Sequence, residues 1–536
     1  MPTGPEGAAP PVLLRIPPFP GAKVRSFQAT RRADFDPTLL DLLREARVGG
    51  AYWGPQPELP AAYVLCRDIG SADAARTLQP GLPLVQWSDG ANSGAAQRVT
   101  GDCDPWHMLA GARALVCDPD DPARQIAALL EVPAYIPDGT GGLTRAAHDV
   151  AELVAPALSW RFASPFGTDE LSAVEAIALC AHWRALIDAN RNIGAALGFA
   201  FWKQEAVGAL LWGGRPVAFV RTLPRDLGSK AVALWRSKAP AGALSSLEAA
   251  GNPVVEVEDG FLRSQGLGAD CVPPLSITVD RLGAYFDPAQ SSELERLLEE
   301  GAFSPLVLER ARKLRAAIIA ARLGKYEQGG EPLPRPAGTR RHILVPGQVE
   351  DDRSVQTGGC GLDSNLELLR RVRAAAPDAY IIYKPHPDVL AGHRKGAIPA
   401  ADAAMLADEI ATDISISSLL EMVDEVHVNT SLAGFEALLR GKQVTTHGVP
   451  FYAGWGLTTD LGPVPARRTA RRSLDELVAA TLLLYPRYLD PVSGLPCPAE
   501  VVVARLSAGQ ARQDGAVVRA RRLQGKVMVR LKALWS

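Results

Sequence analysis

Residues 341–385 read RHILVPGQVEDDRSVQTGGCGLDSNLELLRRVRAAAPDAYIIYKP, two hydrophobic runs separated by an acidic loop and a charged run. The hydrophobic runs are short and rich in β-branched and aromatic residues, which is typical of buried strands. The charged run carries apolar residues at three-to-four spacing and predicts a helix. The alternation continues to residue 448, so this part of the chain predicts an α/β domain with a parallel sheet and right-handed crossovers.

A second, less regular alternation lies upstream. Strands are predicted at PVAFVRT (216–222) and PVVEVED (253–259), and a helix at SKAVALWRS (229–237). A long charged run at residues 292–327 predicts a helical connector between the two α/β units. Together they predict two facing Rossmann-like domains with a cleft, where ligands bind beyond the carboxyl ends of the strands.

The first 190 residues follow a different pattern. Short apolar runs between residues 51 and 137 alternate with turns and helical pieces, which predicts a small α/β region, and residues 143–205 are expected to be mostly helical. The predicted domains are an N-terminal α/β region (1–190), a first Rossmann-like domain with its connector (191–335), a second Rossmann-like domain (336–510) and a C-terminal helix (511–536).

Composition and charge argue against several classes of protein. The formal net charge of -2 gives no overall field for nucleic acid. The seven cysteines are widely spaced without a CxxC pair, which argues against a zinc site or a disulfide framework and favours a reducing compartment. The sequence shows no signal peptide and no apolar stretch long enough for a bilayer, so we expect a cytoplasmic protein.

Loops that follow predicted strands carry the candidate site residues. The lysine and histidine of YKPHPD could neutralise a phosphate, and a Thr-Ser pair at a predicted helix start could bind an anion. The acids of QVEDD are expected to face this edge across the cleft, and a glycine-flanked Tyr and Trp could wall a sugar or base. The candidates are Glu258, Asp259, Arg263 and Ser264; Gln348, Glu350, Asp351 and Asp352; Lys384, His386 and Pro387; Thr430, Ser431 and Glu436; and Tyr452, Gly454 and Trp455.

Each loop taken alone also has an ordinary structural explanation. EDGFLRSQGLG could be a surface turn, the Thr-Ser pair a helix N-cap, the aromatic loop a hydrophobic plug, and the acids a solvated turn or a metal site. Together the loops suit group transfer from an activated phosphate donor. The chain has no G-x-x-x-x-G-K-[ST] motif and no G-x-G-x-x-G after a predicted strand, which argues against a P-loop NTPase and a dinucleotide oxidoreductase.

Six motifs, in order, resemble those of the bacterial capsule-polysaccharide β-Kdo transferases, where Kdo is the acidic eight-carbon sugar 3-deoxy-manno-octulosonic acid. The resemblance runs from about Leu197 to Leu506. It implies a GT-B fold, a CMP-Kdo donor with no metal or other cofactor, retention of configuration, and a Kdo-lipid or glycan acceptor in capsule linker synthesis. The motifs are EDGFLRSQGLG (258–268), PLSITVDRLGAYFDP (274–288), PGQVEDDRSVQTGG (346–359), YIIYKPHPDVLAG (380–392), NTSLAGFEALLRGKQVTTHGVPFYAGWGLTTD (429–460) and YPRYLDPVSGLPCPAE (485–500).

The resemblance also implies where the donor binds. His386 and Pro387, with Thr430 and Ser431, would hold the CMP moiety.

Retention further implies a carboxylate nucleophile from QVEDD. Because the family motif resembles Q-V-E-x-D, Asp352 is the expected nucleophile and Glu350 the candidate acid/base, with Asp351 at a tolerant position. Kdo carries its own carboxylate at the reacting carbon, and Arg263 and Lys384 are the cations expected beside it.

The N-terminal region departs from family members that carry two complete transferase modules, because residues 1–190 are too short for a second one. Residues 104–137 faintly resemble residues 423–450, with Ala127 at the position of Glu436 and no Thr-Ser pair. We interpret the region as a degenerate, inactive half-module. A separate acceptor-binding or docking domain is the alternative.

Residues 511–536 place apolar and basic residues at roughly helical spacing and end near Trp535. This pattern predicts a basic amphipathic helix on the inner-membrane surface, while packing on its own domain is the alternative. Two other functions stay open: a CDP-glycerol-type glycerophosphotransferase, and a catalytically inactive capsule assembly or export protein. The clustered acids of QVEDD favour the sugar transferase.

Overall fold

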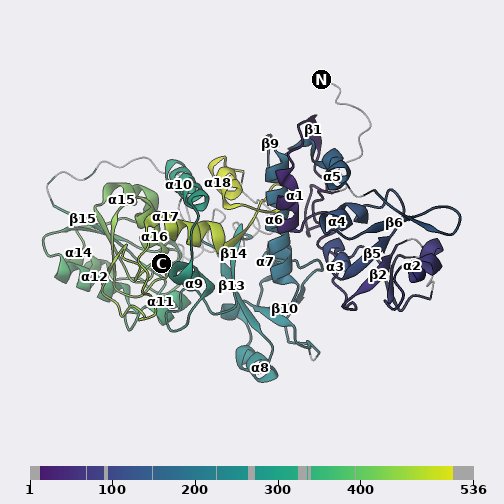
Figure 1. The fold of residues 1–536 in the computed structure, drawn as a ribbon. Helices are drawn as coiled ribbons and strands as arrows, with labels where there is room; N and C mark the ends of the chain where they lie inside the picture. Colours follow the sequence, from purple (N-terminus) through teal and green to yellow (C-terminus); the bar gives the residue numbers. More distant parts are fainter. Residues whose placement is uncertain are drawn as a thin grey trace, which may run out of the picture. The chain divides into compact units, whose positions relative to one another are not determined.

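A computed structural model describes residues 13–67, 69–89, 94–147, 149–224, 226–262, 272–323, 335, 338, 340–392 and 394–510 (Figure 1). The predicted C-terminal helix at 511–536, with Arg263 and Ser264, lies outside the described residues. The described chain forms two compact units. Residues up to Asn192, with Leu211–Val217 and Ser493–Leu495, make the first, and the other described residues make the second.

The first unit is built on a six-stranded sheet in the order β4-β3-β2-β5-β6-β7, parallel except for β7 at one edge. The strands predicted between residues 51 and 137 are confirmed, but the stretch at 143–205 that was expected to be mostly helical contains strands β7, β8 and β9 in this unit. Its elements are β1 (Ala29–Arg32), α1 (Thr38–Ala46), β2 (Tyr63–Cys66), α2 (Ala72–Leu78), β3 (Leu84–Trp87), β4 (Gln97–Val99), α3 (Pro105–Ala110), β5 (Ala112–Val116), α4 (Ala123–Leu129), β6 (Ala134–Pro137), β7 (Leu143–Arg145), α5 (Val150–Leu158), β8 (Trp160–Ala163), β9 (Glu170–Leu171) and α6 (Ala173–Asn190).

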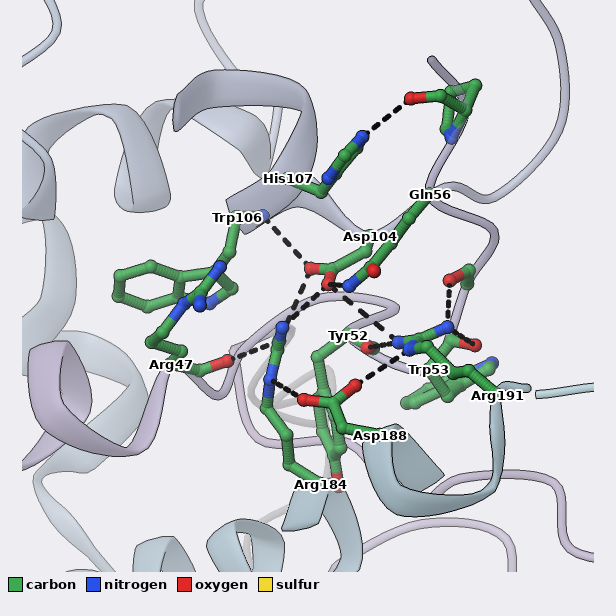
Figure 2. Close-up of polar contacts among 12 residues, drawn as sticks. Arg47, Tyr52, Trp53, Gln56, Asp104, Trp106, His107, Arg184, Asp188 and Arg191 are labelled. Carbon is green, nitrogen blue, oxygen red and sulfur yellow. Dashed lines mark hydrogen bonds and ion pairs between the residues drawn. The ribbon is translucent and has the colours of Figure 1, made fainter. Parts of the chain in front are cut away.

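A buried ion pair ties α3 to α6 in the first unit (Figure 2). The fully buried Asp104 carboxylate caps α3 by accepting from the backbone N–H of Trp106 at 3.1 Å. The Arg184 guanidinium, from α6, donates to this carboxylate at 2.7 Å, and the Gln56 amide donates to it at 2.8 Å. Arg184 also donates to the carbonyl of Arg47 at 2.7 Å. Arg191 also lies 3.8 Å from the Asp104 carboxylate, and Arg184 also pairs with Asp188 at 3.2 Å. Removing either partner would take the nearest opposite charge from a buried group, so the pair helps to fix how α6 packs.

The second unit contains a mixed seven-stranded sheet in the order β11-β10-β12-β13-β14-β21-β22. Strands β10 to β13 are parallel, whereas β14, β21 and β22 run antiparallel to their neighbours. The predicted boundaries place residues 486–497 in the second Rossmann-like domain, but strands β21 and β22 from this segment belong to the seven-stranded sheet. Its elements are β10 (Ile193–Leu197), α7 (Phe201–Leu210), β11 (Ala218–Val220), β12 (Ala231–Leu234), α8 (Ala243–Ala250), β13 (Val254–Asp259), β14 (Ser276–Asp280), β21 (Pro486–Leu489), β22 (Pro496–Cys497) and α18 (Ala499–Ser507).

Two sequence predictions for this sheet are wrong. SKAVALWRS was predicted as a helix, but Ala231–Leu234 is the strand β12 between β10 and β13. All four residues are buried, and a strand covered on both faces is a continuous apolar run that periodicity does not distinguish from a helix. Likewise Ile193–Leu197, expected at the end of a helix, is the strand β10.

The connector is helical as predicted but consists of two helices, α9 (Glu293–Glu300) and α10 (Pro305–Ala320). The chain leaves α9 at Gly301, and the hydroxyl of Ser304 caps α10 by accepting from the backbone N–H of Val307. Pro305 at the first position of α10 suits the start of a helix.

The other sheet of the second unit has six parallel strands in the order β17-β16-β15-β18-β19-β20. Its predicted strands and helices are confirmed from β15 to β19. The elements are β15 (His342–Pro346), α11 (Arg353–Gly358), α12 (Asn365–Ala375), β16 (Tyr380–Lys384), α13 (Pro387–Leu390), α14 (Ala400–Leu406), β17 (Glu409–Ile410), α15 (Ile416–Met422), β18 (Glu425–Val428), α16 (Leu432–Leu439), β19 (Gln443–Thr446), β20 (Thr459–Asp460) and α17 (Leu474–Val478).

This strand order also occurs in the first unit. Counted along the chain, both six-stranded sheets place the third strand at one side, then the second and first, followed by the fourth, fifth and sixth. Only the last strand differs in direction among the described elements, since β20 is parallel to its neighbour and β7 is antiparallel. The two sheets therefore share one topology.

Candidate active site

Beyond the carboxyl ends of the parallel strands, the second unit contains a cavity of about 340 Å³. Loops of the six-stranded sheet form one side, and the end of β13 forms another. Its volume lies within the range typical of small-molecule sites. The predicted site residues in its lining are Glu258, Asp259, Gln348, Asp352, Lys384, His386, Pro387, Thr430, Ser431 and Glu436; Glu350, Asp351, Tyr452, Gly454 and Trp455 are not in the lining.

Lys384 and His386 lie at the end of β16. The ammonium of Lys384, the last residue of the strand, donates to the carbonyl of Thr412 at 2.8 Å. His386 caps α13, and its Nδ1 accepts from the backbone N–H of Asp388 at 3.1 Å. In the neutral ring the proton therefore lies on Nε2, which can donate to a ligand.

Thr430 and Ser431 lie just after the end of β18, in the turn that leads into α16. Ser431 is the N-cap of α16 and accepts from the backbone N–H of Ala433 at 3.2 Å. The side chain of Gln348 donates to the Thr430 hydroxyl and accepts from its backbone N–H, both at 2.9 Å. Gln348 thereby links the loops after β15 and β18. We refer to Lys384, His386, Thr430 and Ser431 as the anion edge.

The three acids of QVEDD have separate partners. Asp352 caps α11 and accepts from the Ser354 hydroxyl at 2.6 Å. Glu350 accepts from the backbone N–H of Asn365 at 2.8 Å, and Asp351 pairs with Arg394 at 3.1 Å on the surface.

The expectation that these acids face the anion edge across the cleft is wrong. Strands β15, β16 and β18 are parallel neighbours, so the loops after them share one sheet edge. The facing carboxylates belong to Glu258 and Asp259 at the end of β13.

Both facing acids form hydrogen-bonded ion pairs with basic side chains. Asp259 accepts from the ammonium of Lys203 at 2.8 Å, and Glu258 accepts from the guanidinium of Arg353 at 3.1 Å. Burial raises the pKa of Glu258 to about 7, although Arg353 opposes the shift. The cavity thus holds one carboxyl group that can exchange a proton near neutral pH.

Tyr452 and Trp455 have no exposed surface and belong to the core of the second unit. The Tyr452 hydroxyl donates to the carbonyl of Ser431, and the Trp455 indole donates to the carbonyl of Phe451 at 2.8 Å. Gly454, between them, adopts a φ of 92° that favours glycine. These contacts match the alternative interpretation of this loop, a hydrophobic plug.

Several cavity contacts were missed from the sequence. Arg353 follows directly after the acids of QVEDD, and its place beside this motif could have identified it as a site residue. Lys203 precedes Asp259 by 56 residues on a different element, and no local pattern pairs the two. Tyr285, Phe286 and Phe451 line the cavity in place of the expected aromatic pair.

Comparison with known proteins finds a family match within the second unit. A model of the family described as "Capsule polysaccharide biosynthesis protein" matches residues 230–334 and 334–488. The "Capsule polysaccharide modification protein LipA" of Neisseria meningitidis serogroup A is 48% identical over 239 residues, 45% of this chain and 34% of LipA. The "Lipopolysaccharide-processing protein LpsZ" of Rhizobium meliloti is 48% identical over 259 residues, 48% of this chain and 58% of LpsZ.

A solved structure decides the family. The "KpsC, beta Kdo 2,4 transferase" of Thermosulfurimonas dismutans is 33% identical, with a TM-score of 0.52, over 58% of this chain and 98% of that chain. The chain belongs to the capsule-polysaccharide β-Kdo transferase family. The predicted GT-B-like α/β fold is confirmed for residues 230–488, which the family model matches and which contain the cavity. We refer to these residues as the family segment. The chain spans about a third to three-fifths of the length of the curated relatives that it matches.

The first unit lies outside the family match, although one of its sheets shares the topology. Matching the last residues of β15 and β2, and of β18 and β5, gives corresponding positions in the two sheets. Gln86 then lies where the family segment has Lys384, and Asp118 lies where it has Thr430. A cation and a hydroxyl of the anion edge are therefore replaced by an amide and an acid.

A carboxylate of the chain also lies at the corresponding helix start. Asp121 accepts from the backbone N–H of Ala123, the first residue of α4, at 2.8 Å. The same carboxylate pairs with Arg67, whose guanidinium lies 4.1 Å from the ring centroid of Trp87. The carboxylate of Asp121 therefore occupies the backbone N–H and the guanidinium that a bound phosphate would need at this edge.

No helix in the part of the chain that the structure describes is long and apolar enough to cross a membrane.

Proposed function

We propose that this protein is a retaining β-Kdo transferase that moves Kdo from CMP-Kdo to a Kdo-lipid or glycan acceptor of the capsule linker. The observation that carries the proposal is one cavity, within the family segment, that joins the anion edge to the carboxylates of Glu258, Asp259 and Asp352. A nucleotide phosphate needs cations and hydrogen-bond donors, and a retained configuration needs a carboxylate and a base.

The anion edge suits the phosphate of CMP. Lys384 supplies a charge, His386 supplies an Nε2 proton, and the start of α16 supplies backbone N–H groups beside Thr430 and Ser431. The same groups would stabilise CMP as it leaves with the electron pair of the broken bond. No metal or other cofactor forms part of this proposal.

Retention requires two displacements. In the first, an enzyme carboxylate bonds to the anomeric carbon while the bond from that carbon to the CMP phosphate breaks. In the second, the acceptor oxygen bonds to the same carbon, the carboxylate leaves, and the hydroxyl proton passes to a base. Glu258 suits the base, because burial raises its pKa to about 7.

Two cavity carboxylates are candidates for the nucleophile. Asp352 fits the motif Q-V-E-x-D, although one of its oxygens is used to cap α11 and accept from Ser354. Asp259 lies beside Glu258, and its ion pair with Lys203 at 2.8 Å orients its carboxylate.

The test measures CMP release, product anomer and covalent adduct with the full chain, CMP-Kdo and a synthetic Kdo-capped acceptor. Wild type should release CMP and form a β-linked product by NMR, and intact mass should show one added Kdo when the acceptor is withheld. Asp352→Asn and Asp259→Asn are matched variants, and peptide mapping of the adduct selects between them. CMP-Kdo turnover that inverts the anomer, or that leaves no adduct on either aspartate, would overturn the mechanism.

The same assay separates the competing functions. Turnover of CDP-glycerol in place of CMP-Kdo would indicate a glycerophosphotransferase. Absence of turnover with either donor would indicate an inactive assembly or export protein. We further propose that the enzyme works in the cytoplasm at the inner-membrane surface, through residues 511–536, because a lipid-linked acceptor would lie there.

A further inference from the structure

Arg353 joins the two sides of the cavity. It is the first residue of α11, directly after the cap Asp352, and so belongs to the six-stranded sheet's side. Its guanidinium lies 3.1 Å from the Glu258 carboxylate and 3.7 Å from that of Glu256, both on β13 of the other sheet. It also lies 5.0 Å from the ring centroid of Phe286. One side chain therefore reaches from the donor-side loops to the proposed base.

The charges around Glu258 come from four elements. Glu256 and Asp259, on the same strand, oppose its ionisation, whereas Arg353 on α11 and Lys203 on α7 favour it. Lys203 is held at 2.8 Å by Asp259. The fourth element is the short turn of helix at Arg236–Lys238, whose Arg236 is held at 2.8 Å by Glu256.

Arg353 thus differs from the other two cations. Lys203 pairs with Asp259 and Arg236 pairs with Glu256, whereas Arg353 contacts Glu258 itself. Opposite charges within 4–6 Å of a carboxyl group lower its pKa by about 1–3 units. Without Arg353, burial and the two neighbouring acids would raise the pKa of Glu258 further.

We propose that Arg353 is a positioning residue that keeps Glu258 able to accept the acceptor's proton, and that it ties this ability to the loop that follows β15. This inference rests on the proposed transferase function, with Glu258 as the base of the second displacement. Arg353 itself forms no bond to the reacting atoms. It acts through the charge and orientation of the carboxylate that it contacts.

Removing Arg353 should change the pKa of Glu258 in a direction that the present contacts determine. Arg353 lowers the pKa of Glu258, so its removal raises that pKa further above the ordinary value. At neutral pH a smaller fraction of Glu258 would be the carboxylate that accepts the proton. The rate of transfer should fall near pH 7 and recover as the pH rises.

The test is the pH profile of kcat/KM for Kdo transfer between pH 5.5 and 9.5, with the full chain. In Arg353→Gln we expect the apparent pKa of the acidic limb to rise by about 1–3 units, so activity near pH 7 falls about fivefold or more. It should rise steadily towards the wild-type value up to pH 9.5. Arg353→Lys, which keeps the charge, should restore most of the wild-type limb.

Arg236→Gln is the matched control, since it removes a nearby positive charge that pairs with Glu256 at 2.8 Å. It should shift the limb less than Arg353→Gln does. Equal melting temperatures would show that the variants are folded at the pH of assay. A profile of Arg353→Gln that is lowered equally at every pH, or that Arg353→Lys fails to restore, would overturn the inference.

Failure of the proposed function would look different. Wild type would then show no CMP release from CMP-Kdo at any pH, or Glu258→Gln would keep the acidic limb. In either case Glu258 would not be the base, whereas a normal wild-type limb with an unshifted Arg353→Gln limb contradicts the role of Arg353 alone.

Discussion

His386 offers a perturbation that separates catalysis from folding. Its Nδ1 accepts from the backbone N–H of Asp388 at 3.1 Å and so caps α13, while Nε2 is the ring atom able to donate to the departing phosphate. Alanine removes both functions. Asparagine keeps the capping oxygen but is too short to replace Nε2, so His386→Asn removes the donor and retains the cap.

The two losses differ in size. Losing an N-cap costs about 1 kcal/mol of stability, so His386→Ala should unfold at slightly lower urea concentration and His386→Asn should not. Losing one preorganised donor at a transition state costs about 2.7–4 kcal/mol, or about 10²–10³ in kcat. Both variants should therefore lose about 10²–10³ in kcat, while only the alanine variant loses stability.

The assay is the initial rate of CMP release from CMP-Kdo with a saturating Kdo-capped acceptor, alongside urea unfolding of each variant. Activity of His386→Asn within threefold of wild type would show that Nε2 donates nothing important. A loss in both variants that tracks their stability would instead assign His386 a structural role.

Three further predictions concern other parts of the molecule. Arg184→Met should lower the free energy of unfolding by up to about 3–5 kcal/mol, because the buried Asp104 would keep only Arg191, at 3.8 Å, as an ionic partner. Arg31→Ala, at an exposed pair, should cost less than about 1 kcal/mol, and urea titration measures both. CMP should bind at one site per chain by calorimetry, in wild type and in Arg67→Gln alike, and a second site would contradict an inactive first unit. Deleting residues 511–536 should abolish binding to anionic liposomes, since each basic residue near such a surface contributes about 1 kcal/mol, and unchanged binding would rule the anchor out.

The sequence predicted the six-stranded sheet of the second unit well because its elements are locally distinct. Strands such as β15 are short and β-branched, and α12 has a clear apolar stripe that begins at a serine cap. The mixed sheet was harder. Its strand β12 is buried along its whole length and looks like a helix, and the return of β21 to the sheet joins residues about 200 positions apart.

The candidate site was predicted in part for a related reason. Residues such as Lys384 and Ser431 stand at strand ends or helix caps, and those positions can be identified from the local pattern. The pairing of Lys203 with Asp259 depends on how two elements pack, which no local pattern encodes. Tyr452 and Trp455 show the converse, because a glycine-flanked aromatic looks the same in sequence whether it lines a cavity or fills a core.

The two six-stranded sheets share a topology but differ in the side chains on which the proposed donor site depends. At corresponding positions one sheet has Lys384 and Thr430, and the other has Gln86 and Asp118. In the second case the carboxylate of Asp121 already accepts from the helix start, so a phosphate would have to displace a charged group and then face an added acid. We therefore expect the loops after the strands to determine nucleotide binding, and we expect that binding in the second unit alone.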